Sequence, residues 1–153
     1  GIGYAEIGRY DSVEDRDGTD PMVANSEWRL LLGHDREIAQ NTTLGLQYSR
    51  TRMSDHDAYS AALPVGSIAT PAQRDVATLR LTRLFMNQTL QTSAFLFHSP
   101  GQKDGLLRLA ADYDVNDSLS VGLGLSKFYG DHDTPFGQFR DASALSIAVR
   151  WSF

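Results

Sequence analysis

The sequence contains no cysteine, only two lysines (Lys103 and Lys127) and no long apolar run. Without cysteine, a disulfide scaffold and a thiolate metal site are both excluded. No apolar run approaches the roughly 18 residues of a transmembrane helix, and none resembles the apolar region of a signal peptide. The formal net charge of −5, with no basic cluster, argues against nucleic acid as a partner.

The bulk composition identifies no class of protein. At 153 residues the chain has the length of one domain, and 41% of its residues are hydrophobic. Its mean hydropathy of −0.31 is that of many water-soluble proteins. Transmembrane β-barrels have similar averages, because their lipid-facing and lumen-facing residues alternate along each strand. The order of the residues therefore matters more than their totals.

The last ten residues, 144–153, alternate most clearly. The odd-numbered positions hold the large apolar residues Leu145, Ile147, Val149, Trp151 and Phe153. The even-numbered positions hold small residues and Arg150. This period of two predicts a β-strand with one apolar face. Its length is that of a tilted strand that crosses a bilayer.

Similar alternation recurs along the chain and predicts about eight strands, with no convincing helix. The pattern is weakest near Arg83, which breaks the apolar phase, and near Phe95, where apolar residues run together. The predicted strands cover residues 1–10, 27–37, 43–49, 76–85, 89–98, 106–115, 119–129 and 144–153.

The connections between these strands predict their topology. Those after the second, fourth and sixth strands are short and contain Asn, whereas the others are longer, and the longest spans residues 54–75. Short turns at one end and long loops at the other are typical of transmembrane up-and-down barrels. The sequence therefore predicts an all-β fold: a single antiparallel up-and-down transmembrane β-barrel domain over residues 1–153.

Alternation does not say which face is outside, and a soluble barrel with its apolar face inward is the alternative. Small residues, arginines and carboxylates on the polar face, with few lysines, favour a confined interior. The predicted lumen-lining charged residues are Glu6, Glu27, Arg29, Asp35, Arg80, Arg108, Asp112, Asp114 and Arg150. The predicted lipid-facing residues are Leu30, Leu32, Leu44, Leu46, Leu79, Leu107, Leu109, Val121, Leu123, Leu125, Leu145, Ile147 and Val149.

Aromatic residues lie near the predicted strand ends, where membrane barrels carry interfacial girdles. They are Tyr10, Trp28, Tyr48, Phe85, Tyr113, Tyr129, Trp151 and Phe153.

Three segments resemble bacterial outer-membrane proteins. The last strand, with Trp151 and the final Phe153, is similar to the closing strand of such barrels. Residues 99–108 (SPGQKDGLLR) and 129–139 (YGDHDTPFGQF) resemble the C-terminal region of porin-like families of the DUF1302 type. The resemblance implies a bacterial outer-membrane location, contacts with lipids and lipopolysaccharide, and recognition of the last strand by the barrel-assembly machinery. Members of these families are several times longer, so the chain is also interpreted as the C-terminal part of a larger barrel.

Three groups of residues are candidates for a chemical site. His98 and Ser99 are adjacent, so a strand points them to opposite faces and prevents direct contact. The runs 55–57 and 131–133, each Asp-His-Asp, have the ligand types for a divalent cation; solvated acidic loops are the simpler interpretation. The prediction assigns no catalytic residue, metal site or cofactor.

The expected function follows from the width of the ring. In a wide barrel the charged residues would line an aqueous pore, and the protein would be a porin or channel, not an enzyme, that passes small solutes passively. In a closed eight-stranded barrel the same residues would pair and plug the interior. The protein would then have a structural or membrane-anchoring role, and the chain would be a truncated or engineered portion.

Overall fold

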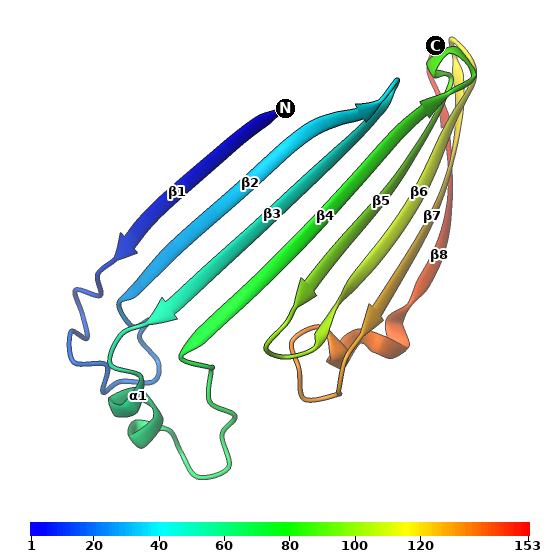
Figure 1. The fold of residues 1–153 in the computed structure, drawn as a ribbon. Coiled ribbons are helices and arrows are strands. Elements are labelled where there is room, and N and C mark those ends of the chain that lie inside the picture. Colours follow the sequence, from blue (N-terminus) through cyan, green and yellow to red (C-terminus); the bar gives the residue numbers. More distant parts are fainter.

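The computed structural model describes residues 1–153 and contains one sheet of eight antiparallel strands (Figure 1). The strands follow each other in the sheet in sequence order, which confirms the predicted up-and-down meander. They are β1 (Ile2–Tyr10), β2 (Glu27–Ala39), β3 (Thr42–Met53), β4 (Gln73–Phe85), β5 (Leu90–Ser99), β6 (Asp104–Asn116), β7 (Leu119–Tyr129) and β8 (Ala144–Trp151).

The connections at the two ends of the strands differ in length, although less than predicted. The turns after β2, β4 and β6 are short, and Asn41 and Asn87 adopt positive φ of 58° and 55°. Asparagine tolerates this left-handed conformation better than most residues. The connections after β1, β3 and β7 are long, but the one after β5 has four residues, as many as the turn after β4. It is short because Ser99 and Asp104, predicted to be loop, pair as strand residues.

The prediction of no helix was wrong in three places, all of them connections. A short helix, α1 (His56–Ala62), lies in the β3–β4 connection, and a 3-10 helix, η2 (Gly137–Ala142), lies in the β7–β8 connection. Three alanines favour α1 locally, and its Tyr59 is the one large hydrophobic side chain that is buried. A third piece, η1 (Met86–Gln88), forms the β4–β5 turn. No helix is both long and apolar enough to span a membrane.

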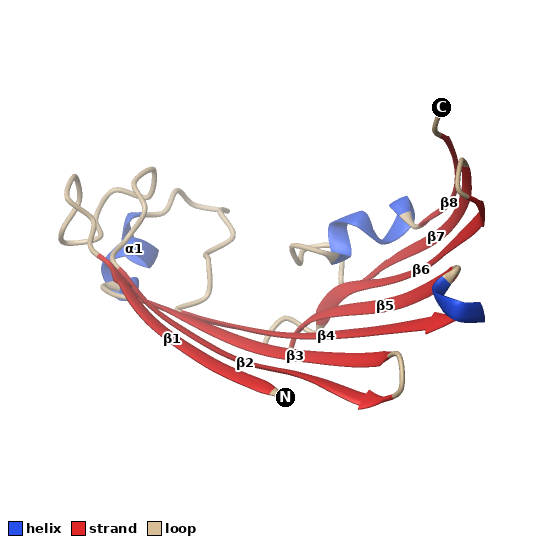
Figure 2. Cartoon of the chain, turned by 90° about the horizontal axis from the view of Figure 1, so that it is seen from above, coloured by secondary structure: helices blue, strands red, loops and turns tan.

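The sheet is an open arc, so the prediction of a closed barrel was wrong for these eight strands. β1 pairs only with β2, and β8 pairs only with β7, so both outer edges are free (Figure 2). An eight-stranded ring has an interior just wide enough for side chains. Here the eight strands do not close, and the β7–β8 connection also lies on the concave side.

The two faces of the arc differ in chemistry. Strand register places Leu32, Tyr48 and Ala77 on one face, because Leu32 pairs with Tyr48 and Tyr48 pairs with Ala77; Leu30, two residues before Leu32 in β2, shares that face. The other face contains Phe97 and Phe128, which pack against Phe136 of the β7–β8 connection. That connection lies inside the curve (Figure 2). We therefore call the Phe97 face the concave face and the Leu30 face the convex face.

The protein has no hydrophobic core of its own. Only 12 of its 153 residues are buried, and most of the buried side chains are polar. The apolar side chains are instead exposed on the convex face: Leu123 is 51% exposed and Ile147 is 70% exposed. An apolar surface this large on an isolated sheet requires a cover.

Candidate functional site: the two faces of the arc

All nine charged residues predicted to line a lumen lie on the concave face. The register links them directly: Asp35, Gly45 and Arg80 form one row across β2, β3 and β4, and the row continues through Phe95 to Arg108. The same register places the remaining members, Glu6, Glu27, Arg29, Asp112, Asp114 and Arg150, on this face. Whether the space beside them is a lumen depends on closure of the ring.

Glu27 is the best-partnered charge of this set. Its side chain is only 11% exposed, and it accepts a hydrogen bond of 2.6 Å from Arg29 Nε and another of 3.1 Å from Arg74 Nη2. Arg29 and Arg74 lie in one row of the concave face, on β2 and β4, with Thr51 of β3 between them in the register. The carboxylate thus joins β2 to β4 across β3, at the end of the sheet with the long connections. Sequence reasoning missed Arg74, although its parity in β4 matches that of Arg80.

Replacement of Glu27 should therefore destabilise the arc. We expect Glu27→Ala to lower the free energy of unfolding by about 2 kcal/mol, since hydrogen bonds to charged groups are lost and two arginines remain close together. Glu6→Ala is the matched control, because Glu6 lies on the same face without an ion pair. Urea unfolding followed by tryptophan fluorescence measures both. Equal losses in the two variants would contradict the assigned role of Glu27.

A second ion pair depends on a glycine. Asp35 and Arg80 approach to 3.8 Å across Gly45, which separates them in the register. A Cβ at Gly45 would collide with the Asp35 carboxylate. Because Gly45 has no side chain, the Asp35 carboxylate can lie over it and pair with Arg80, which joins β2 to β4.

The other charged residues on the concave face make no ion pair. Arg108, Arg150, Glu6, Asp112 and Asp114 have no oppositely charged partner within 4.0 Å. Charged groups without partners need water, because the desolvation of an isolated charge is very costly. The surroundings of these five residues are therefore suited to an aqueous space and not to a dry, paired interior.

The thirteen residues predicted to face lipid all lie on the convex face. Pairs such as Leu109 with Leu125, Val121 with Val149, and Leu123 with Ile147 extend the face across β6, β7 and β8. Arg83, which broke the predicted pattern of β4, is also on this face beyond Leu81. The apparent run at Phe95 divides as well: Ala94 and Leu96 are convex, and Phe95 and Phe97 are concave.

Arginines and aromatic rings border the convex apolar band. Arg9 lies 5.1 Å from the Trp28 ring centroid, and Arg83 lies 4.6 Å from that of Phe85. Trp28 is near the end with long connections and Phe85 is at the turn end. Among the aromatic residues predicted to form girdles, Tyr10 is an exception, because it pairs with Glu27 and so faces the concave side. Trp151 ends β8, and Phe153 follows it by two residues.

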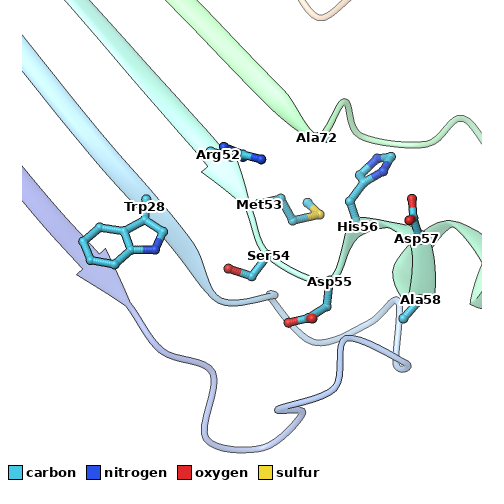
Figure 3. Close-up of a pocket in the computed structure, with 9 residues that line it drawn as sticks. All are labelled: Trp28, Arg52, Met53, Ser54, Asp55, His56, Asp57, Ala58 and Ala72. Carbon is cyan, nitrogen blue, oxygen red and sulfur yellow. The ribbon is translucent and has the colours of Figure 1, made fainter.

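The loop residues weighed as metal ligands do not converge. An open pocket of about 710 Å³ lies between the end of β3 and α1 (Figure 3). There the Asp55 carboxylate points away from His56 and Asp57, and His56 Nε2 lies 2.9 Å from the Thr70 carbonyl oxygen. No three histidine or acidic side chains of the protein are grouped so that they could hold a metal ion.

His98 and Ser99 lie on opposite faces of β5, as their adjacency predicted. His98 pairs with Ala77 and is convex, and its Nδ1 lies 3.0 Å from the Tyr129 hydroxyl. Ser99 pairs with Asp104 and is buried. The two side chains therefore cannot act together as a base and a nucleophile.

The β1–β2 connection is organised by one carboxylate. Asp15 accepts a hydrogen bond of 2.7 Å from the Asp20 backbone N–H and a longer one from the Thr19 hydroxyl. The Asp20 N–H is the largest influence on this group and lowers the pKa of Asp15 below its ordinary value.

This loop should loosen in acid. A lowered folded-state pKa means that ionised Asp15 stabilises the loop above the ordinary carboxyl pKa, and that this contribution is lost as the pH falls through the folded-state value. We expect faster amide hydrogen exchange at Thr19 and Asp20 near pH 2 than near pH 6, after correction for the intrinsic rate. The Asp15→Asn variant, which does not titrate, should show no such change. A pH response that persists in this variant would assign it to another group.

Comparison with protein-family models, with curated proteins and with solved structures gives no match.

Sequence reasoning also missed a contact between the two loop motifs that carry the family resemblance. Asp104, at the start of β6, accepts a hydrogen bond of 2.7 Å from the backbone N–H of Phe136. The motifs are some thirty residues apart in the chain, so neither one indicates its partner. The sequence alone predicted Asp104 to be in a loop and so gave no sign of the contact.

Proposed function

We propose that this protein forms part of the wall of a porin-type or channel-type β-barrel in a bacterial outer membrane and lets small solutes pass by diffusion. The observation that carries the proposal is the direction of the curve: the exposed apolar face is convex and the charged face is concave. A membrane barrel needs this arrangement, with lipid outside and water inside. A soluble lipid-binding barrel needs the reverse.

The convex face supports contact with a bilayer. Its strands contain 8 to 13 residues, close to the roughly 9–11 that a tilted transmembrane strand needs. Arginines stacked on Trp28 and Phe85 at opposite borders match the amphipathic belts of membrane proteins. Lipids and lipopolysaccharide are the partners proposed for this surface. The barrel-assembly machinery is the partner proposed for β8, whose outer edge is free.

The concave face supports an aqueous passage over a plug. Five of its charged residues have no ion pair, and the sheet edges at β1 and β8 are unpaired. Further antiparallel strands at both edges would complete a ring wider than eight strands, in which these charges are hydrated. The plugged barrel with a structural role remains the second candidate, and it requires β1 to pair with β8.

Tryptophan fluorescence tests the orientation of the faces. With Trp28 and Trp151 replaced by Phe, a single tryptophan is placed at Leu109 (convex) or at Ala110 (concave), which are adjacent in the middle of β6. In vesicles of brominated phosphatidylcholine, we expect strong quenching of Leu109→Trp and little quenching of Ala110→Trp. Equal quenching, or a protein that stays folded and monodisperse in buffer without detergent, would contradict the membrane proposal.

Planar bilayer recording tests the passage itself. Stable open current steps are expected from the reconstituted protein where further strands complete the ring at the free edges of β1 and β8, because the concave face has unpaired charges that favour water. Insertion into the bilayer without current would instead favour the plugged, structural candidate.

A further inference from the structure

One connection lies against the concave face, near the ends of β5, β6 and β7, and is held there by specific contacts. Residues 130–143, which we call the inward segment, link β7 to β8 and include η2. Figure 2 shows this segment inside the curve of the sheet, beside β7. The observation matters because, under the proposed function, anything on this side occupies the passage.

Aromatic packing anchors the inward segment to the sheet. Phe136 lies with its ring centroid 4.6 Å from that of Phe97 and 6.4 Å from that of Phe128. Phe139 of η2 adds a second contact with Phe128, at 5.7 Å. Phe97 and Phe128 are in the same row of the concave face, since both register with Leu106. The inward segment thus covers these two apolar rings of the concave face.

Asp104 provides the polar anchor. Its side chain faces the same side of the sheet, the residue is completely buried, and Oδ2 accepts the Phe136 N–H bond. Its other oxygen, Oδ1, has no hydrogen-bond partner in the protein. A buried carboxylate with one unused oxygen is costly to maintain. The bond to the inward segment is the contact that accounts for its position.

Hydrogen bonds and glycines within the inward segment also fix its shape. Thr134 donates a hydrogen bond of 2.8 Å to the Asp131 carbonyl oxygen and accepts one of 3.1 Å from the Gly137 N–H. Gly130 has φ of 130°, and a Cβ there would collide with Asp104. A Cβ at Gly137 would collide with the Asp131 carbonyl. These positions require glycine, so the segment has one compact shape against the sheet.

We infer that the inward segment is a fixed constriction of the passage and that Asp104 is the positioning residue that holds it there. The inference rests on the proposed function, since a constriction has meaning only in a pore. It adds to that function the element that limits the size of the solute. The segment narrows the passage from the side of β5–β8, and the bond at Phe136 together with the three-ring contact keeps it from swinging out.

Two variants release the segment in different ways. Asp104→Ala removes the acceptor of the Phe136 N–H, and Phe136→Ala removes the ring from between Phe97 and Phe128. Asp133→Ala is the matched control, because Asp133 is an exposed acid of the same segment with no hydrogen bond or ion pair. Trypsin cleavage after Arg140, in η2, reports whether the segment is loose without reference to conduction. Single-channel conductance of the reconstituted full chain reports the width of the passage.

We expect both releasing variants to be cleaved faster at Arg140 and to conduct roughly twofold more, because conduction follows the open width. Asp133→Ala should match the wild type in both measurements, and Asp104→Asn, whose amide oxygen can still accept the bond, should recover most of the wild-type behaviour. Unchanged cleavage in Asp104→Ala would overturn the positioning role, and faster cleavage at unchanged conductance would overturn the constriction. A wild-type protein that never conducts refutes the proposed function instead, and the cleavage rates then still decide whether Asp104 holds the segment. If Asp104→Ala fails to fold, Phe136→Ala, whose residue is outside the sheet, decides the result.

Discussion

Leu123→Arg is expected to lower the free energy of unfolding in a bilayer by about 2–4 kcal/mol, the cost of a lipid-facing arginine near the membrane midplane. Leu123 lies in the middle of β7 on the convex face and pairs with Ala111 on one side and Ile147 on the other. Half of its side-chain surface is exposed. In water such an exposed site would accept arginine at little cost, so a large effect requires lipid at this position.

Two controls isolate the effect of the face. Gly124→Arg places the same charge one residue further along β7 on the concave face, where its nearest neighbour is the rotatable Ser146 hydroxyl. We expect a much smaller loss there. Leu123→Ala measures the loss of leucine contacts alone. Urea titration of the protein folded into vesicles, with the fraction folded read from gel mobility without heating, gives all three values. Comparable losses for the two arginine variants would refute the assignment of the faces.

The second large effect concerns the edges of the sheet. We expect the double variant Ala5→Cys with Val149→Cys, which places one thiol on β1 and one on β8, to form no disulfide within the chain. Those strands are at opposite ends of an open arc (Figure 2), and a disulfide needs Cα atoms within about 7 Å. The natural sequence has no cysteine that would interfere.

Val121→Cys with Val149→Cys is the matched control, since these residues pair directly between β7 and β8. Oxidation with copper phenanthroline, followed by non-reducing electrophoresis and mass spectrometry, should show an internal disulfide for this pair alone. An internal disulfide between positions 5 and 149 would show that the eight strands close, and it would favour the plugged barrel. A disulfide between two chains would identify a second copy as the source of the strands beside β1 and β8.

Several features of the fold could be predicted from local pattern because the geometry of a strand imposes them. Alternate side chains of a strand point to opposite faces, so the parity of each segment was enough to separate Leu123 from Gly124 and Arg108 from Leu109. The turns at Asn41 and Asn87 were predictable because few other residues accept positive φ. Even in β4, where Arg83 made the pattern ambiguous, alternate residues continue to point to the same face. Arg83 is on the convex face with Leu81 and stacks on Phe85.

Contacts between distant residues were not predictable from such patterns. The bond from Phe136 to Asp104 joins residues 32 apart, and the Glu27–Arg74 bond joins residues 47 apart. Each contact depends on where a neighbouring strand or connection lies. The alternation of side chains along one strand carries no information about the position of its neighbours. The helix α1 was missed for a similar reason: Tyr59 is buried by other parts of the long connections, not by an amphipathic repeat.

By itself, the sequence determined eight strands, their antiparallel order and the division of their residues between an apolar and a charged face, because the two-residue period of a strand is a local property. Only the tertiary structure decided which face is convex and that the arc stays open. Curvature arises from the combined twist of all eight strands, and the inward segment lies on the concave side of them. Both depend on residues far apart in the chain, which no local pattern can report.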